Sequence, residues 1–359
     1  MVQTKYKIKI YLIYFILLTL ITSCAKKRII LKEEIIEAQK ISTISAIPTS
    51  LFFISAQQTE GDIWLYDIKA NSLWQISFLD NPDLKIISVS PENRYIVISD
   101  EIEQSYIIEI ETHNIIPIKI YPDEKKLIAI NNVCWLSSNS FLCTGLSNIN
   151  ESKIFKVSKT EDEWQSSTFK LPFFNDIVSD INLLSLSHNK KNLAILINNE
   201  MEIKKELYIY NFNSSTLKKL NFLSQSNVDI IWSEDNNEIF YNQDNIIYKI
   251  DLNGFNKILL ITSQKILNIY QNPKYKFKLY YTIQNNENYV SLYLKNTDKI
   301  GPGEFIKEIE GLKNLYFLPD GEHIFYDTYR NEIHYLNLRT LEDNILFSDS
   351  ALFFLTRNE

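Results

Sequence analysis

A repeating unit covers most of this 359-residue chain and limits what the chain can fold into. Each unit begins with an apolar stretch of strand length that ends in a polar turn. The unit starts are spaced by roughly 40 to 50 residues, which is the spacing expected of four-stranded propeller blades. The stretches that begin the units are residues 87–93, 133–139, 184–189, 230–236, 269–273 and 315–321.

The third strand expected in each unit has a signature of its own. An aromatic residue or a histidine is followed three positions later by Asp, Asn or Ser. The ring can fill the space between stacked sheets, and the short polar side chain can bond the backbone of the next turn. The unit that starts at residue 87 departs from this, with Ile107 and Ile110 at those places. The six pairs that show the signature are Trp64/Asp67, Phe155/Ser158, Tyr208/Asn211, Tyr248/Asp251, Tyr293/Asn296 and His334/Asn337.

The two ends of the repeat region complement each other. Residues 351–359 match a first strand and its turn, whereas residues 51–55 match a second strand. The C-terminal strand would therefore complete the N-terminal blade, and closing the ring would remove an exposed end. The sequence predicts an all-β fold, a seven-bladed β-propeller over residues 51–359, with six or eight blades as the alternatives.

The N-terminus has the layout of a lipoprotein signal. Three lysines precede an uncharged apolar run at residues 10–21, which is too short for a comfortable transmembrane helix. Small residues and Cys24 follow it directly, as in a lipobox, where the cysteine thiol takes a diacylglycerol. We predict a signal peptide at residues 1–23 and a lipidated tether or linker at residues 24–50. A single uncleaved anchor is the alternative.

Composition and charge narrow the partner classes. Aromatic and β-branched residues are abundant and the chain has 7 glycines, which suits pleated, half-buried strands. The formal net charge is −7, whereas a nucleic-acid-binding protein would show clustered basic surface. We therefore expect no nucleic-acid partner.

No convincing catalytic or metal-binding constellation is apparent. The chain has no nucleophile elbow, Walker loop or dinucleotide fingerprint, and no His-x-x-x-His or Cys-x-x-Cys spacing that would suit a metal. Asp67 and Asp251 suit turn anchors, and nothing pairs them as acid and base. We therefore expect no enzyme activity, no cofactor and no metal. The four histidines are expected on the surface or in turns: His113, His188, His323 and His334.

Cys134 and Cys143 are the cysteines that remain beside Cys24. A two-residue turn at residues 138–139 would place them directly opposite each other in a hairpin. Directly opposed residues have Cβ atoms ~4.5–5.5 Å apart, wider than the ~3.8 Å usual in a disulfide. Two outcomes stay open: a strained disulfide in an oxidising envelope, or two buried thiols that pack as small apolar groups.

Two segments combine acidic and aromatic residues, at residues 161–165 and 173–176. Aromatic side chains on loops can anchor protein interfaces, so both segments are candidate contact surfaces. The alternative is that Phe173 and Phe174 cap the core between blades.

Residues 63–67, 73–77 and 88–96 resemble the repeats of TolB-type periplasmic propellers. In those repeats a Trp-x-x-Asp strand is followed by Leu-Thr-like residues and then by Ser-Pro-Asp-Gly, although Asp-Gly is present here only at Asp320-Gly321. With the lipidation motif and the richness in Ile, Lys and Asn, the chain resembles a spirochaetal lipoprotein similar to BamB. BamB is the propeller subunit of the outer-membrane β-barrel assembly (BAM) machine.

The resemblance implies a non-enzymatic scaffold that is lipid-anchored in the outer membrane and faces the periplasm. Its implied partners are a BamA-like barrel-assembly protein and other envelope lipoproteins. The alternatives are a TolB-like envelope-integrity partner, a ligand-binding module or enzyme that uses the central channel, and a surface-exposed adhesin.

Overall fold

The computed structural model describes residues 49–55, 62–67, 72–77, 85–99, 104–120, 125–146, 152–161, 163–172, 180–199, 204–223, 228–272, 274–275, 277–318, 320–348 and 350–357. Within these ranges the chain is all-β and forms no helix. Accordingly, no described segment is a helix long and apolar enough to cross a membrane.

The strands form four-stranded antiparallel sets, which we call sheets A to G in chain order; B and C are joined into one nine-stranded sheet. Each sheet other than A takes four consecutive long strands. The strands of sheets A to C, in spatial order within each sheet, are β29 (Ser350–Arg357), β1 (Thr49–Ser55), β2 (Ile63–Asp67) and β3 (Ser72–Gln75) in A; β4 (Lys85–Val89), β5 (Tyr95–Ser99), β6 (Ser105–Glu109) and β7 (Asn114–Ile120) in B; and β9 (Ile128–Ser137), β10 (Ser140–Leu146), β11 (Ser152–Thr160) and β12 (Glu163–Thr168) in C, with the short β8 (Lys125–Lys126) beside β7.

Sheets D to G follow the same order from first strand to fourth. Their strands are β13 (Asp180–Leu186), β14 (Asn192–Asn199), β15 (Lys204–Asn211) and β16 (Thr216–Leu223) in D; β17 (Ile230–Trp232), β18 (Glu238–Gln243), β19 (Ile246–Asp251) and β20 (Asn256–Ile261) in E; β21 (Ile266–Gln271), β22 (Lys278–Gln284), β23 (Tyr289–Asn296) and β24 (Glu304–Glu310) in F; and β25 (Leu312–Phe317), β26 (His323–Thr328), β27 (Ile333–Asn337) and β28 (Asp343–Phe347) in G.

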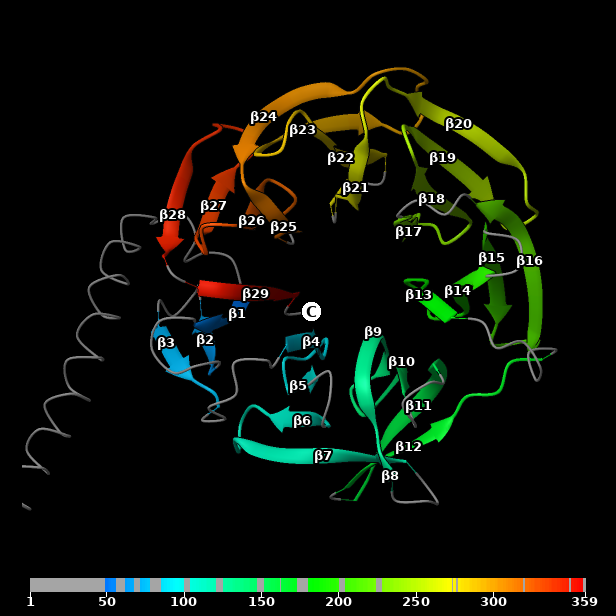
Figure 1. Cartoon of the computed structure of the whole chain (residues 1–359), viewed down its shortest axis with the longest axis vertical. Coiled ribbons are helices and arrows are strands. Elements are labelled where there is room, and N and C mark those ends of the chain that lie inside the picture. The colour runs from blue at the N-terminus through cyan, green and yellow to red at the C-terminus, as the bar shows by residue number, and fades with distance from the viewer. Residues whose placement is uncertain are drawn as a thin grey trace, which may run out of the picture.

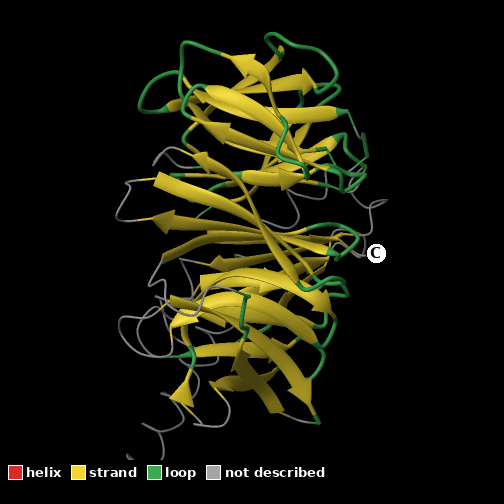
Figure 2. Cartoon of the chain, turned by 90° about the vertical axis from the view of Figure 1, so that its right-hand side faces the viewer, coloured by secondary structure: helices red, strands yellow, loops and turns green. Residues whose placement is uncertain are grey.

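The sheets stand around a common centre, which is the arrangement of a β-propeller (Figure 1). The first strand of each sheet lies innermost and the fourth lies on the rim. From the side, the strands run between the two faces of the ring and the loops lie at those faces (Figure 2). The predicted first strands are confirmed as β4, β9, β13, β17, β21 and β25.

The two ends of the described chain meet in sheet A. Strand β29 pairs antiparallel with β1, and the backbone of Phe353 lies opposite that of Phe53. Strand β1 then pairs antiparallel with β2. The N- and C-terminal segments therefore belong to one sheet, in the strand order 29-1-2-3.

The turn between first and second strands has the same geometry in several sheets. The Ser90 hydroxyl accepts a hydrogen bond from the Tyr95 N–H at 3.0 Å, and the Ser233 hydroxyl accepts one from the Glu238 N–H at 2.9 Å. The last residue of each turn adopts a left-handed conformation, which Asn and Gly tolerate best. These residues are Asn93 (φ 53°), Lys190 (φ 57°), Asn236 (φ 62°) and Gly321 (φ 66°).

The turn between third and fourth strands confirms the predicted role of the polar signature residue. The Asp251 carboxylate accepts hydrogen bonds from the Asn253 and Phe255 N–H groups, each at 2.9 Å. Asn211 and Asn337 accept equivalent bonds from the residues two and three positions further on. Because these bonds satisfy turn donors, the pattern reflects structure rather than chemistry.

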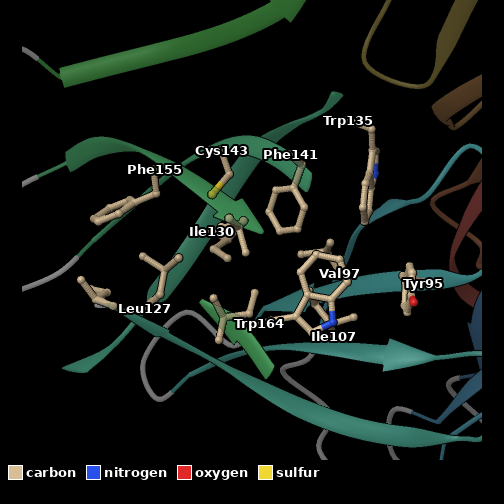
Figure 3. Close-up of a cluster of buried hydrophobic side chains, with 13 residues drawn as sticks. Tyr95, Val97, Ile107, Leu127, Ile130, Trp135, Phe141, Cys143, Phe155 and Trp164 are labelled. Carbon is tan, nitrogen blue, oxygen red and sulfur yellow. The ribbon is translucent and has the colours of Figure 1, made fainter. Parts of the chain in front are cut away.

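Sheets B and C are joined at the rim. Strand β12 pairs in parallel with β7, which places Trp164 opposite Ile118. The Trp164 side chain is 1% exposed and lies in a core cluster with Phe141 and Val97 from the two sheets (Figure 3). The prediction of a contact loop at residues 161–165 is wrong for Trp164, because the turn at Glu161 (φ 52°) leads straight into β12. Residues 173–176 lie outside the described residues.

Cys134 and Cys143 are free thiols in this structure. The β9–β10 hairpin contains a bulge, so Cys134 lies opposite Leu142 rather than opposite Cys143. The two thiols consequently pack in different core clusters, one on each side of the sheet. Burial raises the pKa of both thiols, that of Cys134 to about 12. Of the two outcomes that the sequence left open, the structure therefore shows two buried thiols rather than a disulfide.

Candidate functional site

The second strands of sheets E, F and G each carry, near their ends, a polar residue that bonds the backbone at or beside the first strand of the same sheet. Asn242, Thr282 and Asp327 occupy this place. Each accepts a hydrogen bond from a backbone N–H across the sheet, at 2.7, 3.2 and 2.8 Å. In sheets F and G the pairing is bulged at that point. A bulge leaves a ladder donor unpaired, and the polar side chain satisfies it.

Asp229 lies directly before β17 and reaches the neighbouring sheet F. Its Oδ2 accepts a hydrogen bond from the Ile269 N–H at 3.2 Å. The Asn268 amide nitrogen donates to the same oxygen at 3.2 Å and to the Leu267 carbonyl at 2.9 Å. No described residue donates to the other oxygen, Oδ1. Burial raises the pKa of Asp229 to about 6, although the Ile269 N–H opposes the rise.

Asp327 supplies a second carboxylate from sheet G. Its side chain is 1% exposed. It accepts hydrogen bonds from the backbone N–H of Asn314 at 2.8 Å and from the Asn314 side-chain amide at 3.2 Å. Burial raises the pKa of Asp327 to about 6, while the Asn314 bonds and the Lys313 ammonium act in the opposite direction.

Tyr270, in sheet F, is linked to Asp229 through Asn268. Its hydroxyl donates to the Asn268 amide oxygen at 3.0 Å, so Tyr270, Asn268 and Asp229 form one hydrogen-bonded chain. Burial raises the pKa of Tyr270, and the charges of Asp229 and Asp327 add to the rise. Both carboxylates are therefore within electrostatic reach of this hydroxyl. Burial, Asp327 and Tyr270 raise the pKa of Tyr316 in the same way.

We call these residues the inner polar cluster, because they lie on or beside the inner strands of three adjacent sheets (Figure 1). The cluster consists of Asp229, Asn242, Asn268, Tyr270, Thr282, Asn314, Tyr316 and Asp327. A carboxyl group with a pKa near 6 can exchange a proton near neutral pH, which is what a general acid or base requires. The amides and phenols can orient a ligand by hydrogen bonding.

Within the described residues, no group of three or more His, Cys, Asp or Glu side chains could hold a metal ion. The chemistry of the inner polar cluster is that of carboxyl, amide and phenol groups. These suit proton transfer and hydroxyl recognition.

The histidines divide into two pairs. His113 and His188 are exposed in turns, as predicted. The prediction of a surface or turn position is wrong for His323 and His334. Their side chains are 12% and 14% exposed, and they lie in strands β26 and β27. They are largely covered by neighbouring rings: His334 stacks on Tyr326 with ring centroids 4.6 Å apart, and His323 on Tyr335 at 5.2 Å.

Both buried histidines bond carboxylates. His323 Nδ1 lies 2.5 Å from Asp320, and His334 contacts Asp343 at 3.3 Å and Glu332 at 3.4 Å. Asp343 also accepts from the Tyr326 hydroxyl and from Lys307. Burial alone would raise the pKa of Asp343, but the hydrogen bonds from His334, Tyr326 and Lys307 outweigh it and bring the pKa down to about 2. These contacts hold strands of sheets F and G together.

The remaining predicted site residues take no part in the cluster. Cys24 lies outside the described residues, so its lipidation stays a prediction. Asp251 anchors its turn, and Asp67 ends strand β2 in sheet A.

Sequence reasoning missed the inner polar cluster, although a signal was present. The second strands of three successive units share an aromatic-aromatic-polar triplet. The triplets are Phe240-Tyr241-Asn242, Tyr280-Tyr281-Thr282 and Phe325-Tyr326-Asp327. A carboxylate at the end of an otherwise apolar strand would have marked Asp327. Asp229 has no such mark, because it lies in a connection between units.

No protein-family model matches this chain, and no curated protein does either. Solved structures share its fold. An oligogalacturonate lyase from Vibrio parahaemolyticus has a TM-score of 0.58 at 10% identity, over 84% of this chain and 85% of that one. A putative 6-phosphogluconolactonase from Bacteroides uniformis has a TM-score of 0.57 at 12% identity, over 86% and 99% of the two chains.

A periplasmic gluconolactonase from Pseudomonas aeruginosa gives a TM-score of 0.57 at 10% identity, over 87% of this chain and 99% of that one. At such identities the likeness establishes a β-propeller fold and nothing finer. Nothing in these comparisons supports the predicted resemblance to BamB.

The expectation that the chain is not an enzyme is corrected by these structures. That expectation rested on missing sequence motifs. The propellers of similar structure include a lyase and lactonases, so this fold carries catalysis without the motifs that were sought. Carboxyl groups that come from separate repeats, such as Asp229 and Asp327, leave no local motif.

Proposed function

We propose that the inner polar cluster binds a hydroxyl-rich small molecule, of the sugar or sugar-lactone class, and performs acid–base chemistry on it. The observation that carries this proposal is the Asp229 carboxyl group, whose Oδ2 is held by the Ile269 N–H and whose Oδ1 receives no hydrogen bond from a described residue, with a pKa that burial raises to about 6. Carboxyl groups with a perturbed pKa are typical of catalytic sites.

Asp229 is the better candidate for the general base. Its Oδ2 is held by the Ile269 N–H and the Asn268 amide, which fixes the carboxylate plane. Its Oδ1 receives no bond from a described residue, so it is the oxygen that can take a proton from water or from a substrate hydroxyl. Both Asp327 oxygens accept hydrogen bonds from Asn314. Asp327 therefore suits a residue that sets the local negative charge rather than one that takes up a substrate proton. The solved propellers named for lactone and oligogalacturonate chemistry support the choice of substrate class.

The test is a pH–rate profile of the full-length chain on δ-gluconolactone and on neutral and uronate oligosaccharides. We expect turnover of at least one substrate, with an acid limb near pH 6 from the group that must be ionised. Asp229→Asn should lower the rate at least about 100-fold, within the range that general base catalysis contributes. Asp251→Asn is the matched control, because that carboxylate serves only its own turn.

Two results would contradict this function. One is the absence of both turnover and binding for every substrate in the panel. The other is turnover that Asp229→Asn leaves unchanged.

We also propose, from the strand order, that the ring has seven blades and closes through sheet A. The pairing of β29 with β1 and the seven four-strand sets support this. The lipid anchor at Cys24, the outer-membrane location and the barrel-assembly partner remain proposals that rest on the sequence alone.

A further inference from the structure

We infer that three loop tips on sheets E, F and G insert into the surface of a lipid bilayer and hold the propeller against it. The tips are the turns between the third and fourth strands of these sheets, and each displays a large apolar side chain. Phe255 is 77% exposed, Ile300 is 71% exposed and Leu341 is 45% exposed. We call these residues the apolar tips. The inference goes beyond the proposed function and does not depend on the inner polar cluster.

The apolar tips belong to neighbouring sheets and lie at one face of the ring. Strands β20, β24 and β28, which follow the three turns, succeed one another along the rim (Figure 1). Because every sheet has the same antiparallel strand order, the turns between third and fourth strands all lie at the same face. The tip of sheet F also contacts β20, where the Gly301 N–H donates to the Leu259 carbonyl at 3.2 Å. The three tips therefore share one outer shoulder of the ring.

The corresponding turns of sheets B and D are polar. Residues 111–113 of sheet B are Glu, Thr and His, and residues 213–215 of sheet D are Asn, Ser and Ser; all six are exposed. Single exposed apolar side chains are ordinary on a protein surface. Their recurrence at one turn position in three successive sheets, beside polar residues at the same position elsewhere, indicates a shared contact surface.

The tip of sheet F is held in place by a buried lysine. Lys295 is 2% exposed, and its ammonium donates to the Asn296 carbonyl at 3.1 Å and to the Lys299 carbonyl. Burial, followed by the charge of Lys299, lowers the pKa of Lys295. Burying a charge costs stability. The fold therefore fixes this loop at a cost in stability while leaving Ile300 exposed at its end.

The tips of sheets E and G are fixed as well. The Phe255 N–H donates to the Asp251 carboxylate at 2.9 Å, and the Leu341 N–H donates to the Asn337 carbonyl at 2.8 Å. Leu341 has a φ of 61°, in the left-handed region that a leucine seldom adopts. Because the apolar side chains stand on ordered turns, little backbone freedom is lost when they enter an apolar phase.

The outer strands beside the tips do not favour a protein strand as the occupant. Strands β20, β24 and β28 each pair with a bulge, and a bulge turns a sheet edge away from further pairing. Strands β7 and β12 pair with their inner neighbours without a bulge, and they are the outer strands that pair with each other. Contact at the shoulder of sheets E to G is therefore made by side chains, which suits a fluid apolar phase.

Each apolar tip has an exposed cation close to it in the chain. These cations are Lys257, Lys299 and Arg339. Apolar side chains beside lysine or arginine are typical of segments that lie in a bilayer interface, where long cationic side chains reach the headgroups. Asp298 and Glu342 lie on the same tips, so the affinity comes from apolar insertion rather than from net charge.

The chain enters the propeller at the same face as the apolar tips. Thr49 begins β1, and the next residue, Ser50, lies opposite Asp67. Asp67 in turn lies opposite Ser72, across the turn between the third and fourth strands of sheet A. The segment that precedes Thr49 is therefore joined to the ring at the face where the tips lie.

This segment is the part of the chain that the sequence predicts to reach a membrane. Residues 1–48 contain the apolar run at residues 10–21 and Cys24. Sheet A, where they join the ring, packs against sheet G, with the Tyr66 and Phe347 rings 5.3 Å apart. A bilayer reached by this segment would lie on the side of the ring that carries the tips, and this is our reason for choosing a lipid surface over other apolar partners.

The experiment places an environment-sensitive fluorophore on one turn at a time and adds vesicles of phosphatidylethanolamine and phosphatidylglycerol. The full-length chain carries Cys24→Ser, which leaves the buried thiols of Cys134 and Cys143. A nitrobenzoxadiazole label is attached at Ile300→Cys. The matched control is a label at Ser214→Cys, because Ser214 lies exposed in the corresponding turn of sheet D, at the same face.

With vesicles, the label at Ile300→Cys should gain at least about twofold in fluorescence and shift to the blue, because it enters an apolar phase. The label at Ser214→Cys should not respond. Adding Phe255→Ser and Leu341→Ser should weaken the vesicle binding that the Ile300→Cys label reports by at least about fivefold, through the loss of buried apolar area. Circular dichroism checks that this variant keeps its fold, which the exposure of both side chains leads us to expect.

Several results would overturn the inference. The first is a label at Ile300→Cys that does not respond to vesicles, or that responds no more than the label at Ser214→Cys. The second is vesicle binding that Phe255→Ser and Leu341→Ser leave unchanged. The third is a response that appears without vesicles and grows with protein concentration, because a second copy of the chain would then cover the tips.

Discussion

Sheets B and C and sheets E to G join neighbouring blades in different ways. Sheets B and C fuse at the rim through the parallel β7–β12 pairing and share an apolar cluster around Trp164. Sheets E to G stay separate and are linked at their inner strands by polar side chains, such as Asn242 and Asp229. Apolar burial stabilises without specific chemistry. Buried carboxylates cost stability and provide reactive groups.

The largest effect should follow from Trp164→Ala. The Trp164 ring packs against Tyr95 with centroids 5.1 Å apart and against Phe141 at 6.0 Å. Its removal leaves a cavity between two sheets, and we expect a loss of about 3–5 kcal/mol in the free energy of unfolding. Urea denaturation followed by circular dichroism measures it. The matched control is Trp74→Ala, because Trp74 is 47% exposed and should change stability by less than about 0.5 kcal/mol.

Equal losses for the two tryptophan variants would contradict this account of the fused sheets. Trp164 would then be no more important for packing than a surface tryptophan. Trp164→Phe refines the test. The indole Nε1 is buried without a hydrogen-bond partner among the described residues, so a ring without that donor should recover more than half of the loss.

The second largest effect should have the opposite sign. Asp327→Asn is expected to stabilise the protein at pH 8, because it removes a buried negative charge. A pKa of about 6 in the fold, against 3.8 for the free side chain, corresponds to a cost of about 3 kcal/mol once the group is ionised. We expect a gain of about 2 kcal/mol at pH 8, since the altered contact with Asn314 offsets part of it.

The pH dependence fixes the sign of this effect. The folded state holds the Asp327 proton between pH 3.8 and about 6, where the unfolded chain has lost it. Stability from this group is therefore complete below pH 3.8 and falls as the pH rises to about 6. Urea midpoints of the two proteins should differ at pH 8 and converge near pH 4. A variant that destabilises at both pH values would show that the carboxylate is structurally required.

The contrast between the regions also explains what the sequence could predict. The turn residues and the third-strand signature form their hydrogen bonds within a few residues of the chain. They therefore recur in each unit, and they predicted strands such as β5, which begins at Tyr95, and β27, which contains His334. The joining of sheets B and C at the rim depends on residues far apart in the sequence. The polar residues beside Trp164 led to the prediction of a loop, and the parallel pairing of β12 with β7 has no sequence pattern that would predict it. Asp229 and Asp327 belong to different sheets, E and G. Their roles follow from burial, which composition and spacing do not show.

A smaller loss should follow from Asn242→Ala. This side chain is 1% exposed, accepts from the Asp229 N–H at 2.7 Å and donates to the Leu267 carbonyl of sheet F at 3.3 Å. Its removal leaves the Asp229 N–H without an acceptor, at a cost of about 1–2 kcal/mol, whereas the Leu267 carbonyl keeps its bond from Asn268. Ligand binding by the inner polar cluster should weaken as well, because Asp229 loses its backbone anchor. Thermal unfolding and a titration with neutral oligosaccharides measure the two effects.

The smallest effect should come from a polar link between sheets F and G that lies at the surface. Arg330 and Glu310 form an ion pair at 2.5 Å, with side chains 66% and 43% exposed. Water screens such a pair, so Arg330→Gln should change the free energy of unfolding by less than about 0.5 kcal/mol. Urea denaturation at low salt and in 1 M NaCl should show any difference shrinking with salt. A loss as large as that of Asn242→Ala would mean that the charge pair, rather than the buried inner bonds, holds these two sheets together.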